Sequence, residues 1–220
     1  MAVLGIDTAG PVVGVALWSE RGVRLWSQRI IRRANSVLLP AVAELLSDTE
    51  LDLVAVSVGP GAFTGLRVGV SVALGVALSR NLPVVAVSSL AARAAMVREE
   101  RVLALLDARK GKVYVGLFDA SEPVPVLIGT ERDCLLSAAL PDVPCVAVGE
   151  GAVVFRDEIT AAGGRCSPDA ARSPADEVAR LGHLQRASAQ DAGAVALRYL
   201  RPPDARPPRS VGQQIGRRGD

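Results

Sequence analysis

The sequence predicts a two-lobed α/β fold, and three observations lead to this prediction. Three apolar segments separated by turn residues open the chain, and helix-like and strand-like segments then alternate up to residue 100. Beyond residue 100 a new series begins, again with apolar strands. We therefore expect a first lobe over residues 1–100, with a mixed five-stranded sheet and flanking helices, and a smaller, degenerate second lobe over 101–201. A disordered tail rich in Arg, Pro and Gly is expected over 202–220.

The elements of the first lobe follow from local patterns. Apolar runs bounded by turn residues are expected to be its strands, at Val3–Ile6, Val12–Trp18, Val23–Ile30, Leu53–Val58 and Pro83–Val87. Apolar residues at helical spacing after a Ser or Thr cap predict three helices, at Ser36–Leu46, Thr64–Arg80 and from Ser88 or Ser89 to Arg98. This order resembles the ribonuclease-H-like half of the actin, sugar-kinase and Hsp70 ATPase (ASKHA) superfamily, so we expect an actin-like fold.

The second lobe gives weaker signals. Its predicted strands are Val102–Asp107, Val113–Phe118 and Cys145–Val148, with an extended stretch at Pro123–Val126. A cap at Ser173, a proline at the first helical position and two acids in the first turn predict a helix that ends near Arg186. A last helical stretch is expected over Ala189–Ala196.

Composition excludes several classes of protein. Aromatic residues make up only 3% of the chain, so a surface that stacks bases on exposed rings is not expected. The net charge of +2 predicts neither nucleic-acid nor membrane affinity for the body of the protein, although five arginines from Arg201 onward face only two aspartates. Three cysteines without a CxxC pair, no secretory leader, and no apolar run long enough to span a bilayer predict a cytoplasmic location.

The search for catalytic residues finds little. The single histidine, His183, lies inside a predicted helix, so a zinc or iron site cannot be built from the usual His and Cys motifs. A Ser-His-Asp triad would have to use the same residue, and no GxSxG motif is present. We therefore expect no catalytic residues and no metal ligands.

Two turns could in principle hold phosphates. The loop from Gly59 to Gly65 joins a strand to a helix without the GK[ST] ending of a Walker A loop, and a tight turn with a capped helix is the alternative interpretation. In actin-like proteins the first hairpin, here at Asp7, holds magnesium and phosphates, but its residues are also ordinary turn formers. Vestigial or partner-shared nucleotide contacts are expected at Asp7, Thr8, Gly61, Thr64, Gly65, Arg67, Asp107 and Arg109.

The most distinctive feature is the helix predicted from Thr64 to Arg80, which is apolar all round. Gly and Ala recur every four residues along it and form a smooth ridge, and such a helix must be covered on both faces. We expect it to form, with the preceding helix, a protein–protein surface; the alternative is that the two helices cover each other within one subunit. The predicted interface residues are Leu38, Leu39, Val42, Leu45, Leu66, Gly69, Val70, Ala73, Leu74 and Ala77.

Several motifs occur in an order that resembles the TsaB (YeaZ) family. The longest runs from Val58 to Gly69 (VGPGAFTGLRVG), and LGIDT, LLP, VSSL and DAR occur around it. The resemblance implies a non-catalytic dimerisation subunit that pairs with a TsaD-like catalytic paralogue and a TsaE-like ATPase. That complex transfers a threonylcarbamoyl group to N6 of the tRNA adenosine beside the anticodon. The resemblance also implies a homodimer in isolation, no intrinsic cofactor, and ATP or ADP with Mg²⁺ only at a surface shared with the partner.

The chain departs from that pattern at three places. Asn35 stands where relatives often have His, Lys112 stands where an acidic residue is usual, and the Arg-rich tail has no counterpart. Two alternative functions from the same superfamily stay open at this point. An ATP-dependent kinase would need a second acidic phosphate loop, for which only Asp107 is available, and a metal-dependent peptidase would need ligands beyond His183.

Overall fold

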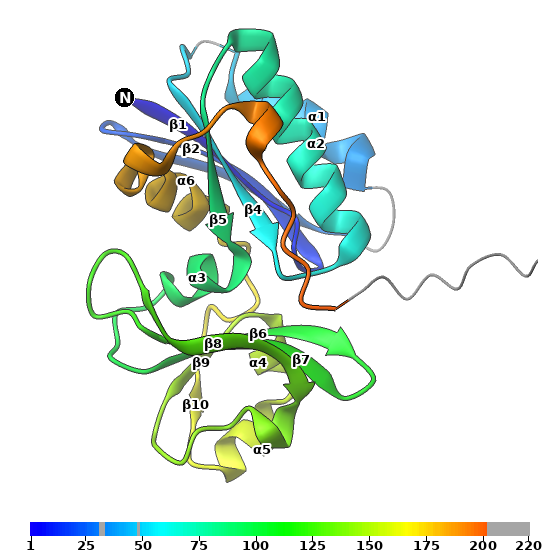
Figure 1. Cartoon of the computed structure of the whole chain (residues 1–220), viewed down its shortest axis with the longest axis vertical. Helices are drawn as coiled ribbons and strands as arrows, with labels where there is room; N and C mark the ends of the chain where they lie inside the picture. The colour runs from blue at the N-terminus through cyan, green and yellow to red at the C-terminus, as the bar shows by residue number, and fades with distance from the viewer. Residues whose placement is uncertain (31–33, 48, 202–220) are drawn as a thin grey trace, which may run out of the picture.

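The first lobe is built on a sheet with strand order β3-β2-β1-β4-β5 (Figure 1). The computed structural model describes residues 1–30, 34–47 and 49–201. The strands of this sheet are β1 (Ala2–Asp7), β2 (Val12–Ser19), β3 (Gly22–Arg29), β4 (Leu53–Gly59) and β5 (Val84–Ser88). β1 pairs antiparallel with β2 and parallel with β4, so the sheet is mixed as predicted. β1 and β4 are buried along their whole length, which explains their nearly continuous apolar sequences.

Helices cover both faces of this sheet. α1 (Ala34–Leu45) and α2 (Phe63–Arg80) share one apolar core with β1, β2 and β4. α6 (Ala175–Leu184) covers the opposite face and contacts the same three strands. The sequence-based prediction places this helix in the second lobe over 101–201; instead the chain returns to the first lobe before α6. The predicted extent of the second lobe is corrected accordingly, whereas its first strand begins near residue 100 as predicted.

The second lobe has a five-stranded sheet of its own, with strand order β10-β9-β6-β7-β8. Its strands are β6 (Val102–Arg109), β7 (Lys112–Asp119), β8 (Val126–Leu135), β9 (Val146–Val148) and β10 (Arg165–Cys166). The short helices α4 (Glu150–Val154) and α5 (Arg156–Ala161) share an apolar core with one face of this sheet. α3 (Ser89–Ala94) packs on the other face, where its apolar residues join β6 and β7 in a core that connects the lobes.

Five segments differ from the sequence-based expectation. β8 extends to Leu135, although only Pro123–Val126 was expected to be extended. α3 ends at Ala94 instead of Arg98, and α4 and α5 were not predicted. The stretch 189–196 holds, in place of a helix, a 3₁₀ turn at Ala192–Ala194 and an isolated antiparallel bridge between Gln190 and Val84. The tail over 202–220 and the side chain of Asn35 lie outside the described residues.

The C-terminal segment crosses from the first lobe to the second. After the turn at Ala192–Ala194, which joins the core under α2, the backbone N–H of Arg198 donates to the carbonyl of Val58 at 2.8 Å. The chain then reaches the second lobe beside β6 and β7, where Arg201 is the last described residue (Figure 1).

Candidate functional site

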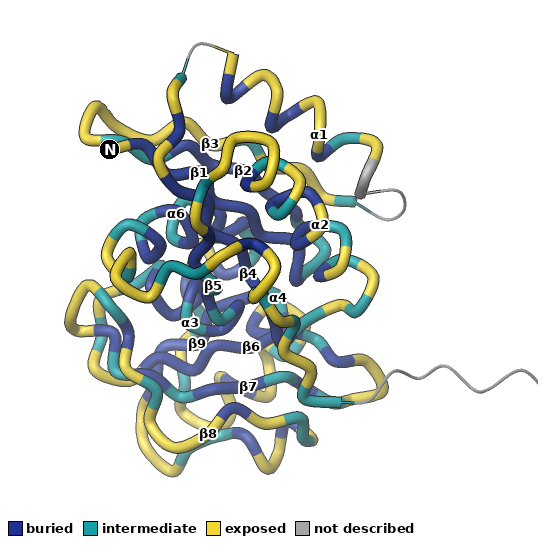
Figure 2. The backbone as a smooth tube through the Cα atoms, turned by 45° about the horizontal axis from the view of Figure 1, so that its top comes forward, coloured by how far each residue is buried: buried dark blue, intermediate teal, exposed yellow. Residues whose placement is uncertain are grey.

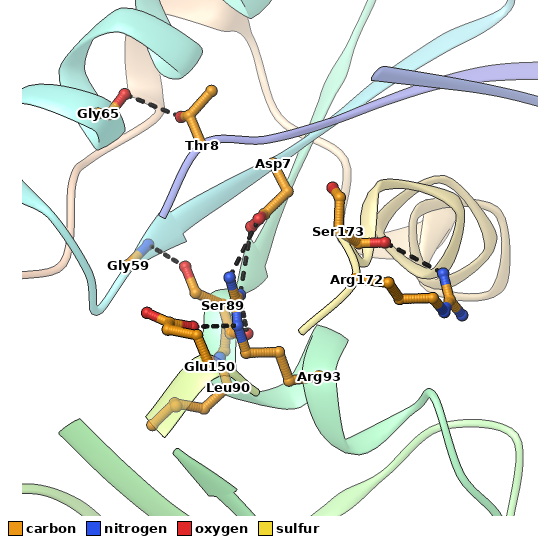
Figure 3. Close-up of polar contacts among 11 residues, drawn as sticks. Asp7, Thr8, Gly59, Gly65, Ser89, Leu90, Arg93, Glu150, Arg172 and Ser173 are labelled. Atoms are coloured by element: carbon orange, nitrogen blue, oxygen red, sulfur yellow. Dashed lines mark hydrogen bonds and ion pairs between the residues drawn. The ribbon is translucent and has the colours of Figure 1, made fainter. Parts of the chain in front are cut away.

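An ion-pair network lies where the two lobes meet. Asp7 ends β1, Arg93 lies on α3 and Glu150 begins α4, and the three side chains converge (Figure 3). The Arg93 guanidinium donates to both Asp7 carboxylate oxygens, at 3.4 Å and 3.2 Å, and its Nε lies 3.7 Å from the Glu150 carboxylate. Asp7 and Arg93 are buried. This group, the Asp7–Arg93–Glu150 network, therefore places two carboxylates and one guanidinium in the junction between the lobes.

Local backbone features hold these side chains in place. The Ser88 hydroxyl accepts hydrogen bonds from the first backbone N–H groups of α3, which fixes the helix that carries Arg93. Gly149 precedes α4 with a φ of 90°, a conformation that other residues rarely adopt. A Cβ at Gly10, in the hairpin after β1, would lie 3.0 Å from Arg93 and 3.1 Å from Glu150. The first hairpin thus packs directly onto the network and leaves little space for a side chain at Gly10.

The surroundings keep the Arg93 guanidinium protonated and favour the protonated form of Glu150. Burial by itself lowers the pKa of Arg93, but the charges and hydrogen bonds of Asp7 and Glu150 raise it above its ordinary value. Burial raises the pKa of Glu150 to about 7, although the positive charge of Arg93 acts in the opposite direction. Arg93 is therefore mainly the partner of Asp7, and Glu150 is partly protonated near neutral pH.

The network does not fit a resident magnesium ion. A carboxylate that binds Mg²⁺ must offer its oxygens to the metal, whereas both oxygens of Asp7 accept hydrogen bonds from Arg93. Among the described residues, no group of three or more His, Cys, Asp or Glu side chains is placed to hold a metal ion. The guanidinium supplies the positive charge that a metal would otherwise supply next to Asp7.

Several of the predicted nucleotide contacts lie together at the first hairpin, beside Asp7, and the others do not. Thr8 is buried, and its hydroxyl donates to the carbonyl of Gly65 at 2.8 Å, so it fastens α2 to the first hairpin. Gly61 lies against Ala9 in the same hairpin, because a Cβ at position 61 would lie 2.6 Å from the carbonyl oxygen of Ala9. Thr64 is exposed at the start of α2.

Besides Asp7, the set has three charged residues, and one of them, Asp107, donates its backbone N–H to the carboxylate of Glu150 in the network. The Arg67 guanidinium lies 3.9 Å from the centre of the Phe63 ring. Asp107 and Arg109 form an ion pair with each other at 3.4 Å at the end of β6. Sequence reasoning found Asp7 but missed Arg93, for which the available signal was one cation inside an alanine-rich helix.

The structure corrects the predicted partner surface. The Gly/Ala ridge of α2 faces the chain's own first lobe, since a Cβ at Gly69 would lie 2.1 Å from the hydroxyl oxygen of Thr8. The prediction that the ridge meets a partner is therefore wrong. Eight of the ten predicted residues are buried within the subunit: Leu38, Val42, Leu45, Leu66, Gly69, Val70, Ala73 and Ala77. Leu74 is half-buried, and Leu39 is exposed.

The opposite sides of the two helices are exposed and largely uncharged. Figure 2 shows buried and exposed positions alternating along α1 and α2. The outer helix face is defined as the exposed, uncharged residues Ser36, Leu39, Pro40 and Ala43 of α1 and Ser71, Gly75 and Leu78 of α2. The exposed charged residues of the two helices are Glu44, Arg67 and Arg80. A single chain thus covers the inner sides of both helices and leaves an apolar outer side.

The length of α2 invites a membrane interpretation. By length and composition alone, α2 is long and apolar enough to cross a bilayer. Over residues 1–30, 34–47 and 49–201, no other helix meets this criterion. Its inner side packs against β4 in the first lobe, as expected for an apolar helix in the core of a folded protein.

Comparison with known proteins finds one matching family model and several proteins of similar sequence. A family model, "TsaD: tRNA N6-adenosine threonylcarbamoyltransferase", matches residues 28–124. The tRNA threonylcarbamoyladenosine biosynthesis protein TsaB of Escherichia coli K12 is 36% identical over 131 residues, covering 56% of this chain and 57% of the relative. TsaB of Bacillus subtilis 168 is 37% identical over 126 residues, covering 54% and 55%. The matched region thus spans a little over half the length of these curated relatives.

The fold also has a close counterpart among solved structures. YeaZ from Pseudomonas aeruginosa matches with a TM-score of 0.75 and 26% identity, covering 90% of this chain and 99% of the other. Together with the two mixed five-stranded sheets, this likeness confirms the predicted actin-like, two-lobed α/β fold.

Proposed function

Since the chain belongs to the TsaB family, we propose that it is a non-catalytic subunit of the complex that transfers a threonylcarbamoyl group to N6 of the tRNA adenosine beside the anticodon. In this complex a TsaD-like subunit carries out the transfer and a TsaE-like ATPase takes part. The chain meets tRNA as a member of the complex, in the cytoplasm and away from membranes. In isolation it forms a homodimer through the surface that the TsaD-like subunit otherwise occupies.

The outer helix face is the observation that carries this proposal. It combines exposed Leu39 and Leu78 with small residues on two adjacent helices that cover the same face of the sheet. Small residues let another helix approach closely, and large apolar side chains at the same surface supply area to bury. These are the properties of a helix-to-helix contact with a second chain.

A non-catalytic role also agrees with the chemistry of the described residues. The ring of the single histidine, His183, stacks on Trp18 with the ring centres 4.2 Å apart, a packing role on α6. The acid of the first hairpin, Asp7, is paired with Arg93. We propose that the chain has no nucleotide site of its own, and that ATP or ADP with Mg²⁺ binds only where the partner contributes ligands.

Co-purification tests the proposal. The chain is expressed with the TsaD-like protein of the same organism, as wild type and as the double variant Leu39→Glu/Leu78→Glu. We expect the wild type to elute as a complex and the variant to bind the partner at least about tenfold more weakly, because two charges would be buried at the contact. A matched control is Val126→Glu/Val154→Glu, which places two charges at exposed valines of the second lobe.

The control should bind the partner as well as the wild type. Transfer of the threonylcarbamoyl group to a tRNA transcript by the reconstituted complex should fall with the first variant and not with the second. If the wild-type chain does not associate with the TsaD-like protein, or if both double variants behave alike, the proposal is wrong.

A further inference from the structure

Both lysines of the chain lie at the hairpin that joins β6 to β7. Lys110 is exposed at the tip, and Lys112 is the first residue of β7. Arg109, Lys110 and Gly111 have positive φ angles of 66°, 56° and 71°, so the backbone reverses sharply between the two antiparallel strands. Three cationic side chains, of Arg109, Lys110 and Lys112, therefore occur within four residues at one edge of the second lobe.

Two arginines near this hairpin form ion pairs, and in both pairs the carboxylate is less exposed than the guanidinium. The Arg109 side chain is 84% exposed, whereas that of its partner Asp107 is 18% exposed. Arg198 in the C-terminal segment is 47% exposed, whereas Glu131, whose carboxylate lies 3.0 Å away, is 1% exposed. The carboxylates thus lie beneath the guanidinium groups, and the charge presented to solvent is positive.

The C-terminal segment joins this cationic edge. Arg201 donates to both carboxylate oxygens of Asp133, each at 2.7 Å, and to the carbonyl of Ala108 at 3.1 Å, next to the hairpin. The hydrogen bond from Arg201, and to a smaller extent the charges of Arg201 and Lys112, lower the pKa of Asp133. In sequence, the 202–220 stretch that follows adds four arginines and two aspartates.

We propose that Arg109, Lys110, Lys112, Arg198 and Arg201 form one surface, the basic band, that binds phosphate groups of the tRNA substrate. This inference rests on the proposed function and extends it, because it names the part of this chain that meets the RNA.

The chemistry of the basic band suits a nucleic-acid backbone better than a set of bases. Lysine ammonium groups attract phosphates as point charges and carry no sequence information. The charges follow a hairpin edge and a chain segment that lie side by side, so they can contact successive phosphates. Neutralising each phosphate releases counterions from the RNA, which makes the attraction steeply dependent on salt.

A salt series tests the basic band. The assembled complex with the TsaD-like subunit is titrated with a labelled, unmodified tRNA transcript that has adenosine beside the anticodon. The test variant is Lys110→Gln/Lys112→Gln. The matched control, Arg21→Gln/Arg156→Gln, removes two exposed cations from the β2–β3 turn and from α5. A chain that ends at residue 201 measures the contribution of the tail separately.

Loss of two phosphate contacts should reduce the slope of log K against log salt by about 1.5 and weaken binding about 30-fold near 0.1 M salt. The control should retain the wild-type slope, and all variants should assemble with the TsaD-like subunit. The basic band is refuted if test and control variants bind alike, if only the tail deletion lowers affinity, or if the lysine variant fails to assemble, which would indicate a protein contact. The same series on the isolated chain tests the basic band even if no complex forms, so that this outcome is separable from failure of the proposed function.

Discussion

Replacing Arg93 by methionine is the most direct test of the Asp7–Arg93–Glu150 network. Methionine keeps an unbranched side chain of similar length but has no N–H donors. The change removes both hydrogen bonds to Asp7 and a third to the carbonyl of Ser89 at 2.9 Å. It leaves Asp7 buried without a counter-ion, which is more costly than removing a whole ion pair.

The cost can be worked out from the burial of Asp7. Breaking a buried pair by removing one partner destabilises proteins by about 3–5 kcal/mol. The folded variant can avoid a buried charge by keeping one aspartate protonated, which costs about 4 kcal/mol at pH 7 and about 1.5 kcal/mol at pH 5 relative to an unfolded chain. We therefore expect Arg93→Met to lower the free energy of unfolding by about 4 kcal/mol at pH 7, and by clearly less at pH 5.

Urea unfolding followed by circular dichroism at the two pH values measures this difference. Adding Asp7→Asn to the variant removes the unpaired charge and should recover much of the stability at pH 7. Arg165→Met is the control, because its ion pair with Glu99 is exposed and should contribute about 0–1 kcal/mol at either pH. A loss below about 1 kcal/mol at pH 7, an equal loss at both pH values, or no recovery with Asp7→Asn would contradict the reasoning.

Two further predictions concern stability. Burial raises the pKa of Glu150 to about 7, so between about pH 4.5 and 7 the folded state holds a proton that the unfolded state releases. The free energy of unfolding of the wild type should therefore fall by up to about 3 kcal/mol as pH rises through this window. Urea unfolding midpoints measured across the window should show this decrease for the wild type and not for Glu150→Gln. Gly69→Ala should cost about 1–3 kcal/mol because its Cβ would meet Thr8, whereas Gly75→Ala, with open space around its Cβ, should stabilise α2 by up to about 1 kcal/mol. Thermal melts of the two glycine variants compare the inner and outer sides of one helix, and a similar response of both would contradict the packing.

The sequence was sufficient for the buried strands and for the exposed edge strand β3, whose run is bounded by turn residues, and insufficient for the edge strand β8. β1 and β4 lie in the middle of their sheet, so their apolar runs marked them plainly. β8 is an edge strand with most of its residues at least partly exposed, and its sequence includes Glu131, Arg132 and Asp133. Nothing in such a sequence requires burial, and the pairing with β7 along the sheet edge decides its structure.

Only part of the Asp7–Arg93–Glu150 network was predicted from the sequence, for a related reason. Asp7 follows an apolar strand in a turn, and that local pattern is readable. Its partner Arg93 lies 86 residues later, and no local pattern connects the two. In the same way, the sequence predicted α6 as a helix but not the sheet that it covers. Local patterns specify elements, whereas pairing between distant elements depends on the fold as a whole.

The ridge of α2 shows what a small-residue pattern can establish. Gly65 and Gly69 indicate that another part of a protein approaches the helix backbone closely, because a Cβ at either position would collide with its neighbour. The pattern does not say whether that neighbour belongs to the same chain. Here it is Thr8, at the end of β1, so the ridge fastens α2 to the first hairpin and fixes the hairpin against Arg93. The side of α2 that is available to a partner is therefore the one on which Gly75 and Leu78 lie, where the sequence has no regular ridge.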